Sequence, residues 1–341
     1  MNQKLSEKIK ILGFLMTCFM IFYHCGALDN SYALNATDAA FNTFLSNIFD
    51  VMGVFVMSHF FAVTGFLLFR NLNLKNYPTK IKRRVFSLLI PYVTWQVIIT
   101  LKLVLQGQYI FSLKDFLYKT FYLVMWPSDG AMWYVYAVFL LALVSPIFLL
   151  IFKNKNIGWG LVVVIIIFLS AQRNITNEMF VRIVNHGYVG NILFYFPSYL
   201  VGAFYGKFYD ELHQENRLVY IFSVLFIAFL LEGTFPGFLS NTTIKLMPIM
   251  GLFLLPVIPS LKDKWVYRLT FLMYAMHQPL IDDIRWRIYD FYEYISIPVS
   301  VSNILTRVII LISVIILSTI IYVILNKFAP KALTALTGGR D

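Results

Sequence analysis

Residues 11–24 read ILGFLMTCFMIFYH, an apolar run that no charged residue interrupts before its final histidine. Apolar runs of about twenty residues recur from one end of the 341-residue chain to the other, and that length crosses about 30 Å of hydrocarbon as a helix. Charged residues make up 13% of the chain, whereas soluble domains carry about 25%. The sequence therefore predicts an all-α, polytopic membrane protein with no stretch left for a separate soluble domain.

Counting about twenty apolar residues per span gives about ten transmembrane helices in a single domain over residues 1–341. The second and last runs are longer than a bilayer needs, so each is expected to tilt, kink or protrude. Residues 110–125 are aromatic and lightly charged, which favours a helix lying at the membrane interface. The predicted spans are 10–27, 41–69, 85–105, 131–152, 156–171, 188–206, 217–234, 243–260, 267–284 and 300–326.

The formal charge of +11 does not indicate nucleic-acid binding, because the Lys and Arg residues lie between apolar spans and form no continuous basic face. The preference of Lys and Arg for cytoplasmic loops explains them better. With the N-terminus inside, most of the 28 Lys and Arg residues fall in inner segments, so both termini are predicted to be cytoplasmic. Cys18 and Cys25 both lie at the first span, which indicates neither a disulfide framework nor a cysteine metal site.

Ionisable side chains inside the spans are few, and such residues usually face the bundle interior and mark a pathway or a site. His24 lies in the outer half of the bilayer, where an interfacial histidine bonded to a backbone carbonyl is an alternative to a catalytic one. For His277, near mid-membrane and close to Pro279, a structural hydrogen bond and a catalytic role are both open. His59 stands before FAVTGF, whose small residues favour helix packing. The other polar positions are Asp50, Glu232 and Arg307.

Residues 68–95, LFRNLNLKNYPTKIKRRVFSLLIPYVTW, form the densest cationic stretch of the chain. Such clusters usually set topology and contact anionic membrane lipid. The same groups bind a phosphate, to which Arg offers two parallel donors. Pro91 lies inside the third span, where a break in backbone pairing is tolerated if it lines protein or a water-filled cavity. The combination indicates a cavity that opens to the inner side.

Six segments together resemble the acyltransferase-3 family of bacterial integral membrane proteins, and the resemblance covers nearly the whole chain. Each segment is weak alone, but their order, spacing and membrane sides agree. The segments are FMIFYHCG (19–26), FFAVTGFLLFR (60–70), RRVFSLLIPYVTW (83–95), MWYVYAVFLLALVSPIF (132–148), FYFPSYLVGAFYGKF (194–208) and YRLTFLMYAMHQPLI (267–281).

The resemblance implies a ten-helix enzyme of the bacterial cytoplasmic membrane that takes an acyl group, commonly acetyl, from cytoplasmic acyl-CoA. The acceptor would be a hydroxyl of an extracytoplasmic glycan, either an exported polysaccharide or a lipid-linked sugar. The resemblance also implies that His24 is catalytic and that Arg83 and Arg84 handle acetyl-CoA. The family usually has Arg or Lys eleven residues before this histidine, where this chain has Gly13, and Lys10 could substitute for it.

Acyl transfer to a hydroxyl needs a base for the hydroxyl proton and a group that stabilises the developing oxyanion. We expect His24 to be the base, since histidine titrates near neutral pH, and His277 to be a second acid/base or orienting group. Asp50, in the neighbouring span, could hold the His24 tautomer. Lys10 lies about 40° around and about 21 Å along the same helix from His24. It would join Arg83 and Arg84 at the phosphates of CoA.

Two other functions stay open at this stage. The chain could be a transporter or flippase for a glycan or lipid precursor, although the sequence has no internal repeat of the kind that builds many transporters. It could also be a structural or regulatory partner of a polysaccharide synthase or export machinery. The outer loops 28–40 and 282–298 carry aromatic residues that would stack on an acceptor sugar, and an interfacial aromatic belt would use the same residues.

Overall fold

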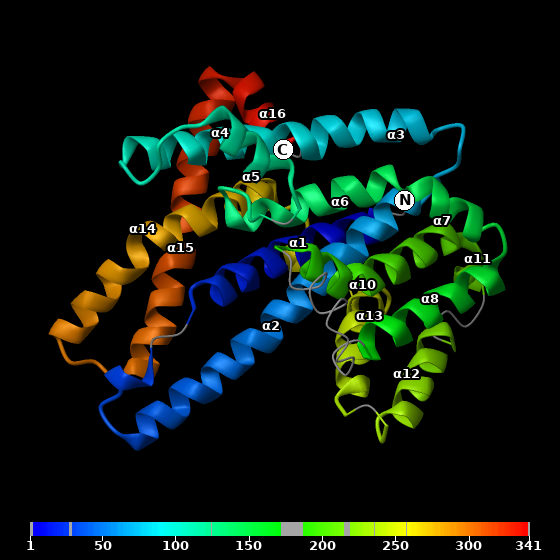
Figure 1. Ribbon diagram of the computed structural model, residues 1–341, viewed down its shortest axis with the longest axis horizontal. Helices are drawn as coiled ribbons and strands as arrows, with labels where there is room; N and C mark the ends of the chain where they lie inside the picture. Colours follow the sequence, from blue (N-terminus) through cyan, green and yellow to red (C-terminus); the bar gives the residue numbers. More distant parts are fainter. Residues whose placement is uncertain are drawn as a thin grey trace. The chain divides into compact units, whose positions relative to one another are not determined.

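Figure 1 shows the computed structural model, which describes residues 3–26, 29–123, 125–171, 187–214, 219–234, 236–256 and 258–339. Every regular element in these ranges is a helix, which confirms the all-α prediction for this part of the chain. Each of the ten predicted spans falls on one helix or on two in succession. These are α1 (Gln3–His24), α2 (Ala36–Phe69), α4 (Ile90–Leu105), α6 (Trp133–Leu143) with α7 (Ser145–Ile151), α8 (Lys155–Ala171), α10 (Val189–Lys207), α12 (Val219–Leu231), α13 (Phe238–Leu254), α14 (Thr270–Tyr294) and α15 (Val299–Phe328).

Several shorter helices connect these elements. Residues 110–125 contain α5 (Leu113–Phe121), whose start is capped where Ser112 Oγ accepts a hydrogen bond from the Asp115 N–H. The cationic inner segment, expected as a loop, contains α3 (Tyr77–Arg84), because a proline in its first turn favours a helix start. The remaining short elements are α11 (Tyr209–Gln214), α16 (Pro330–Thr337) and the single turns η1 (Asn30–Tyr32), η3 (Gly130–Met132), η5 (Pro259–Leu261) and η6 (Trp265–Leu269).

Three helical stretches of the described chain are long and apolar enough to cross a membrane: Ala36–Phe69, Tyr77–Leu105 and Val299–Phe328. Residues Gly130–Leu143 and Ser145–Ile151 make a fourth if this pair, bent by 51°, is one broken span. These helices support a membrane protein. The full set of ten spans, the cytoplasmic termini and the interfacial position of α5 stay predictions.

The chain divides into two compact units. Unit 1 consists of Met1–Val56, Asp129–Ala131 and Val257–Asp341, and unit 2 of Met57–Ser128 and Met132–Pro256. The long helix α2 contributes its first part to unit 1 and its last part to unit 2. The single domain over residues 1–341 stays a prediction.

In unit 1, α1 packs against α14 and α15, and Figure 1 shows α14 and α15 side by side. Polar side chains tie the start of α2 to the start of α15. The Asp38 carboxylate accepts hydrogen bonds from the N–H groups of Val299 and Ser300 at 2.8 and 3.0 Å, at the helix end where N–H groups lack intrahelical partners. The buried Asn303 side chain donates to Asn42 Oδ1 at 2.6 Å. Unit 1 is therefore held together by polar groups as well as by apolar packing.

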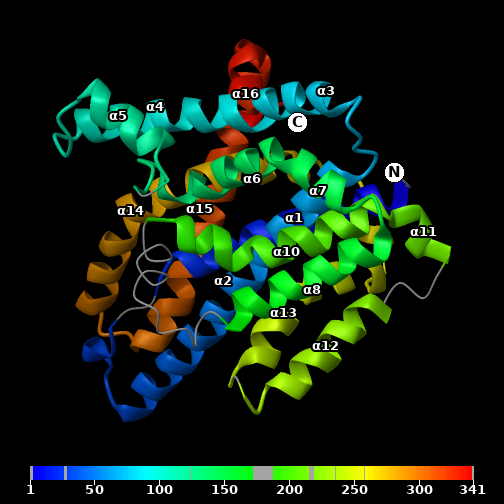
Figure 2. The same ribbon diagram turned by 45° about the vertical axis from the view of Figure 1, so that its right-hand side comes forward.

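In unit 2, α10 packs against α8 and α13, and α12 contacts both of them (Figure 2). The last part of α2 approaches α10 through glycines. A Cβ atom at Gly65 would overlap the Tyr199 carbonyl oxygen, and one at Gly202 would overlap the Ala62 carbonyl oxygen. Gly202 and Gly206 are four residues apart, the spacing by which small residues let membrane helices pack closely. Close packing is what the FAVTGF segment predicted.

Two irregularities lie close together where α3 leads into α4. Val85–Leu89 is a π-helical turn in which the Ile90 N–H donates to the carbonyl of Val85, five residues back. Pro91, which has no N–H to donate, follows directly. The backbone break that Pro91 predicted is therefore found in the turn before it, and such π-turns are frequent at functional sites.

Candidate active site

The end of α1 presents His24, which is the last residue of this helix and is half-buried. Carbonyl groups in the last turn of a helix lack intrahelical donors, and nearby cations interact favourably with them. Arg307 Nε donates to the Phe22 carbonyl at 2.9 Å, and Arg285 Nη1 donates to the Cys25 carbonyl at 3.1 Å. Two arginines thus hold the backbone on both sides of His24.

Arg307 is only 2% exposed, so its charge has to be satisfied inside the protein. Its Nη1 donates to the Asn303 carbonyl at 2.9 Å, and its guanidinium carbon lies 4.0 Å from the centre of the Phe49 ring. It also interacts electrostatically with Asp50. The polar residue that the sequence identified in the last span is an anchor for the end of α1.

Gly26, two residues after the end of α1, has a backbone conformation that few other residues adopt. Its φ angle of 68° lies in the left-handed region that glycine adopts without strain. A Cβ atom there would lie 2.9 Å from Arg285 Nη1, the atom that bonds the Cys25 carbonyl. Glycine therefore permits both the turn after His24 and the approach of Arg285.

His277 on α14 is fully buried, and its ring centre lies 5.0 Å from that of His24, so the structure brings the two predicted histidines together. His277 Nδ1 lies 2.5 Å from the Tyr274 carbonyl oxygen. A carbonyl oxygen can only accept, so the hydrogen is assigned to Nδ1, and Nε2 keeps the lone pair. Nε2 is buried and has no hydrogen-bond partner in the described structure, which leaves it available as a base or acceptor.

Gln278 connects His24 to a carboxylate. Its side chain is hydrogen-bonded to His24, and its Nε2 donates to Asp282 Oδ1 at 2.9 Å. A ring nitrogen that is bonded in this way has a defined orientation. Gln278 is therefore placed where it can orient the His24 ring.

Asp50 lies on α2 and is exposed. The interactions described for it are electrostatic and join it to Tyr23 and Arg307, not to His24. Lys10 is exposed on α1, the continuous helix that ends at His24, as the predicted spacing requires. The roles of Asp50 and Lys10 stay predictions.

Arg83 and Arg84 lie in unit 2, in the last turn of α3 and directly before the π-helical turn. Arg83 is exposed, whereas Arg84 is half-buried and interacts electrostatically with Tyr134 and Tyr199. The Tyr134 hydroxyl in turn donates to the Phe60 carbonyl at 2.9 Å. The two arginines therefore differ, since one faces outward and the other reaches a tyrosine network inside unit 2.

Arg70, at the end of α2, was part of the cationic segment but was not singled out by the sequence. Its guanidinium carbon lies 3.9 Å from the centre of the Tyr209 ring, and its Nη2 lies 3.4 Å from Asp210 Oδ1. Its Nε and Nη1 are buried and have no acceptor among the described residues. Buried guanidinium donors without an acceptor are candidates for an anionic ligand.

Three residues that position the histidines were missed, although α14 carried the signal for them. Tyr274, Gln278 and Arg285 are spaced by four and seven residues, so they share one face of the helix with His277. Tyr274 and Gln278 lie inside the predicted span 267–284, whereas Arg285 falls in the segment 282–298, which the sequence predicts as an outer loop. The spacing would have connected Arg285 with the other two only if α14 had been known to continue to Tyr294.

The arrangement in unit 1 can move a proton and stabilise negative charge. An imidazole nitrogen with a free lone pair can accept a proton, and Arg285 Nε is a buried donor with no acceptor in the described structure. No group of three or more His, Cys, Asp or Glu side chains in the described ranges could hold a metal ion. The chemistry that these residues support is acid–base catalysis.

Comparison with known proteins identifies the family. The model of the acyltransferase-3 family, described as an acyltransferase domain, matches residues 9–323, which is nearly the whole chain. No curated protein and no solved structure matched the chain. The match includes His24, His277 and the arginines of α3. The chain therefore belongs to the acyltransferase-3 family, and this membership together with its apolar helices identifies it as a membrane acyltransferase.

Proposed function

We propose that the protein is a membrane-embedded O-acyltransferase that moves an acyl group, most simply acetyl, from cytoplasmic acyl-CoA to a hydroxyl of an extracytoplasmic glycan. The acceptor is an exported polysaccharide or a lipid-linked sugar, and the membrane is the cytoplasmic membrane of a bacterium. One observation supports the proposal most strongly: His24 is held at the end of α1 by two arginines and lies against the second histidine, His277.

His24 acts as the general base in this proposal. It takes the proton from the acceptor hydroxyl while the hydroxyl oxygen attacks the thioester carbonyl carbon. The C–O bond forms, the C–S bond breaks, and the proton passes from His24 to the CoA thiolate. Acetyl-CoA and the sugar hydroxyl are thereby converted to the sugar ester and CoA, with no oxidant or other reagent.

His277 supports His24 in one of two ways. Its Nε2 is unprotonated in the tautomer assigned above, so it can accept a hydrogen bond from the His24 ring or hold the proton in transit. Two imidazolium charges with ring centres 5.0 Å apart would repel each other, so the pair carries one extra proton at most. We assign His277 the role of second acid/base or orienting group.

The arginines of unit 2 bind the donor in this proposal. Arg83 and Arg84 are the proposed ligands of the CoA phosphates, and Arg70 is added because its buried Nε and Nη1 have no acceptor among the described residues. Lys10 stays the ligand that the sequence predicts as a substitute for the basic residue of the family. Guanidinium groups bind phosphate oxygens through two parallel hydrogen bonds, a geometry that Lys cannot reproduce. Arg84→Lys should therefore weaken acetyl-CoA binding, and glycan binding should be unchanged.

The test is acetyl transfer from labelled acetyl-CoA to glycan in membranes that contain the full chain. His24→Ala should lower the rate by about 10²- to 10⁴-fold, the usual contribution of a positioned acid–base group. Cys18→Ala, on the same helix and outside the proposed site, is the matched control and should keep the wild-type rate. Unchanged transfer by folded His24→Ala protein would exclude His24 as the base.

A cellular measurement separates acyl transfer from transport. If the protein is an acyltransferase, cells with His24→Ala should export a glycan that lacks its O-acyl groups. If the protein is a transporter, the glycan should instead stay inside the cell. Retention of the glycan with normal acylation would therefore contradict the proposal.

A further inference from the structure

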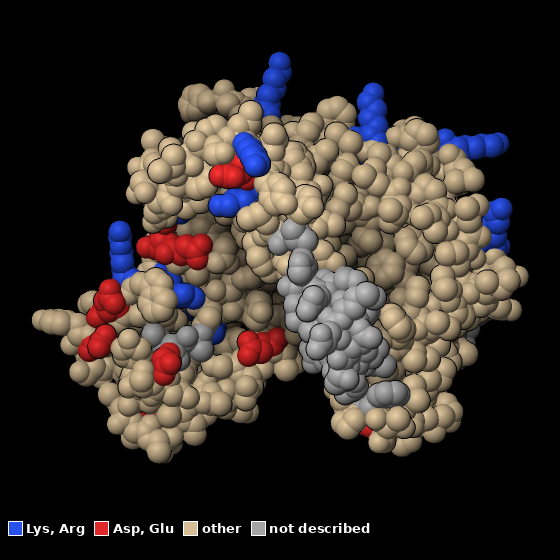
Figure 3. Space-filling view, in the orientation of Figure 1, with Lys and Arg blue, Asp and Glu red and all other residues tan. Residues whose placement is uncertain are grey.

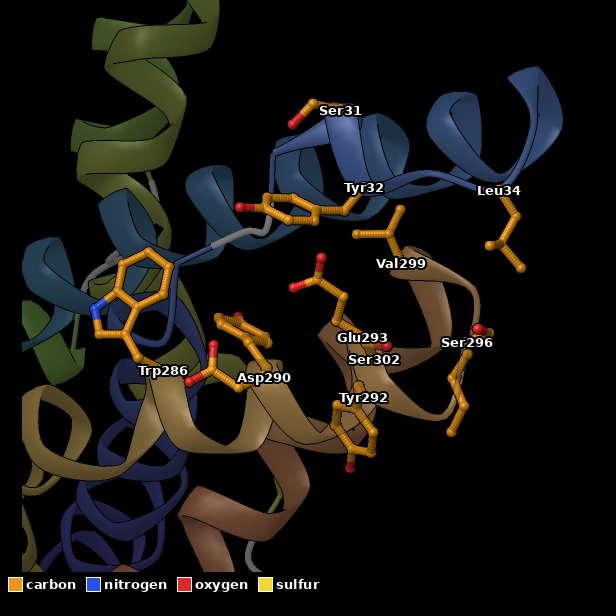
Figure 4. A pocket seen from close by; sticks show the side chains of 12 residues that line it. Ser31, Tyr32, Leu34, Trp286, Asp290, Tyr292, Glu293, Ser296, Val299 and Ser302 are labelled. Atoms are coloured by element: carbon orange, nitrogen blue, oxygen red, sulfur yellow. The ribbon is translucent and has the colours of Figure 1, made fainter.

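A pocket of about 300 Å³ lies in unit 1, away from the residues assigned so far. It is enclosed by the segment around η1, the last turns of α14 and the first turns of α15 (Figure 4). The segments 28–40 and 282–298, which the sequence connected with a sugar, thus meet in one place, although residues 282–294 form the end of α14 and not a loop. The side chains that matter here are Tyr32, Trp286, Tyr289, Asp290, Tyr292 and Glu293.

The aromatic residues of the pocket fall into two classes. Tyr32 and Trp286 are 50% and 57% exposed, whereas Tyr289 and Tyr292 are 5% and 6% exposed and form the wall. The guanidinium carbon of Arg285 lies 4.6 Å from the centre of the Trp286 ring and covers one of its faces, which leaves the other face for a ligand. Aromatic rings bind apolar surface through their faces, and the C–H face of a pyranose ring is such a surface. A pocket with exposed aromatic rings beside buried ones suits a flat ligand, because such a ligand can place its apolar side on an exposed ring face.

The polar groups of the pocket are acceptors and hydroxyls. The carboxylate of Glu293 points from α14 toward Tyr32 (Figure 4), and Asp290 lies one turn earlier on the same helix. Carboxylates only accept hydrogen bonds, so they select a ligand that donates them, such as a sugar with several hydroxyls. The Tyr289 hydroxyl is buried and has no hydrogen-bond partner in the described structure, a state that usually calls for a ligand or water.

The charge of the pocket limits the kind of sugar. No Lys or Arg is among the described residues that line it, whereas Asp290 and Glu293 are. Over the part of unit 1 that α14 forms, acidic side chains lie beside Lys and Arg side chains (Figure 3), so the acidic character belongs to the pocket lining itself. Two carboxylates without a lining cation repel a uronate, a sialate or a sugar phosphate. The pocket therefore suits an uncharged sugar.

Hydrogen bonds connect the walls of the pocket. The Asp38 carboxylate accepts bonds from Leu34 N–H at 3.2 Å and from the Ser300 hydroxyl at 2.6 Å, which ties the η1 segment to α15. Asp29 caps η1, and hydrogen bonds from the Ser31 backbone and side chain lower the pKa of its carboxyl group. A preorganised wall costs less ordering entropy when a ligand binds.

Tyr289 links the pocket to the candidate active site. It interacts electrostatically with Arg285 and Arg307, the two arginines that hold the backbone around His24. Arg285 lies one turn before Tyr289 on α14. We infer that the pocket is the binding subsite for an uncharged pyranose unit of the acceptor glycan, next to the unit whose hydroxyl reacts at His24. This inference rests on the proposed function.

The experiment measures binding of defined oligosaccharides to the purified full-length protein in nanodiscs, by saturation-transfer NMR. The probes are neutral tetrasaccharides of glucose, galactose, mannose and N-acetylglucosamine, with tetragalacturonate as the anionic comparison. At least one neutral probe should bind, and Trp286→Ala should weaken it about tenfold. Trp265→Ala is the matched control, since Trp265 is 51% exposed in the same unit and does not line the pocket.

Further variants test the chemistry of the pocket. Tyr289→Phe keeps the ring, removes the unpartnered hydroxyl and should weaken the neutral probe severalfold. Removing both charges with Asp290→Asn and Glu293→Gln should allow tetragalacturonate to bind. Failure of every neutral probe to bind, or equal affinity in Trp286→Ala, would overturn the inference.

Transfer kinetics separate this inference from the proposed function. Trp286→Ala should raise the KM for the acceptor about tenfold and leave the KM for acetyl-CoA unchanged. If wild-type protein transfers acetyl and Trp286→Ala has an unchanged acceptor KM, the subsite is wrong and the acyltransferase stands. If neutral sugars bind in the pocket but no acetyl is transferred, the subsite stands and the acyltransferase proposal fails.

Discussion

Units 1 and 2 join their helices by different means. In unit 1, buried polar side chains such as Asp38 and Arg307 bond to backbone groups at helix ends. In unit 2, glycines at positions 65 and 202 let two helices touch backbone to backbone. Polar contacts at helix ends fix where particular side chains lie, whereas glycine contacts only bring helices close. We therefore expect substitutions in unit 2 to affect folding first and those in unit 1 to affect activity first.

The largest effect should come from Gly202→Ala in unit 2. The added methyl group would overlap the Ala62 carbonyl, and backbone atoms cannot move aside as a flexible side chain can. Overpacking of this kind costs about 1–3 kcal/mol or more. The folded yield in detergent and the thermal midpoint should both fall sharply.

Gly160→Ala is the control for this substitution. Gly160 lies on α8, and a Cβ atom there would meet nothing within 4 Å. Alanine should therefore fit and raise helix stability by about 0.5–1 kcal/mol. Equal thermal midpoints for Gly202→Ala and Gly160→Ala would mean that α2 and α10 do not touch as described.

The histidine pair should give the next largest effect, on rate and not on folding. If His24 and His277 act as one unit, His277→Ala should lower acetyl transfer by about 10²-fold or more. The double variant should then cost little more than His24→Ala alone, because groups that act together are not additive. The measurement is single-turnover transfer in membranes. Strictly multiplicative losses would show that the two rings act independently.

Arg307→Lys should have a smaller and mixed effect. Lysine keeps the positive charge next to Asp50 but cannot donate to the Phe22 and Asn303 carbonyls in the geometry of the guanidinium fork. Leaving a buried carbonyl unsatisfied costs about 1–3 kcal/mol. We expect a lower thermal midpoint and a lower transfer rate, with the KM for acetyl-CoA unchanged. A normal rate at normal stability would remove Arg307 from the support of His24.

The all-helical class was predictable from sequence because a segment that crosses hydrocarbon has to pair its own backbone groups, and every regular element of the described ranges is a helix. The contact between His24 and His277 was not predictable, since two residues 253 positions apart meet only through the packing of α1 on α14. Arg285 was missed for a similar reason, because its partner is the carbonyl of Cys25 and a carbonyl leaves no sequence signal. The sequence shows which residue types are available, whereas the contacts between distant residues come only from the packing of the helices.

The smallest effect should come from the departure of this chain from its family at Gly13, where the resemblance leads us to expect Arg or Lys. A Cβ atom at Gly13 would meet nothing within 4 Å, so a long side chain fits there. If Lys10 replaces the missing residue, Lys10→Ala should raise the KM for acetyl-CoA, and adding Gly13→Lys to it should restore the wild-type value. An exposed charge contributes about 0.2–1 kcal/mol, which corresponds to a change in KM of about 1.4- to fivefold.

The double variant Lys10→Ala, Gly13→Lys needs two controls, one for helix stability and one for the loss of a charge. Gly13→Lys also improves helix propensity, so thermal stability is measured beside KM and should rise whether or not CoA is bound. Lys264→Ala removes an exposed charge elsewhere in unit 1 and should leave the KM unchanged. A charge effect should also shrink at high salt, whereas a change in helix stability should not. Gly13→Lys could stabilise the protein without restoring the KM for acetyl-CoA in the Lys10→Ala variant. That result would show that acetyl-CoA binding does not need a basic residue on this face of α1.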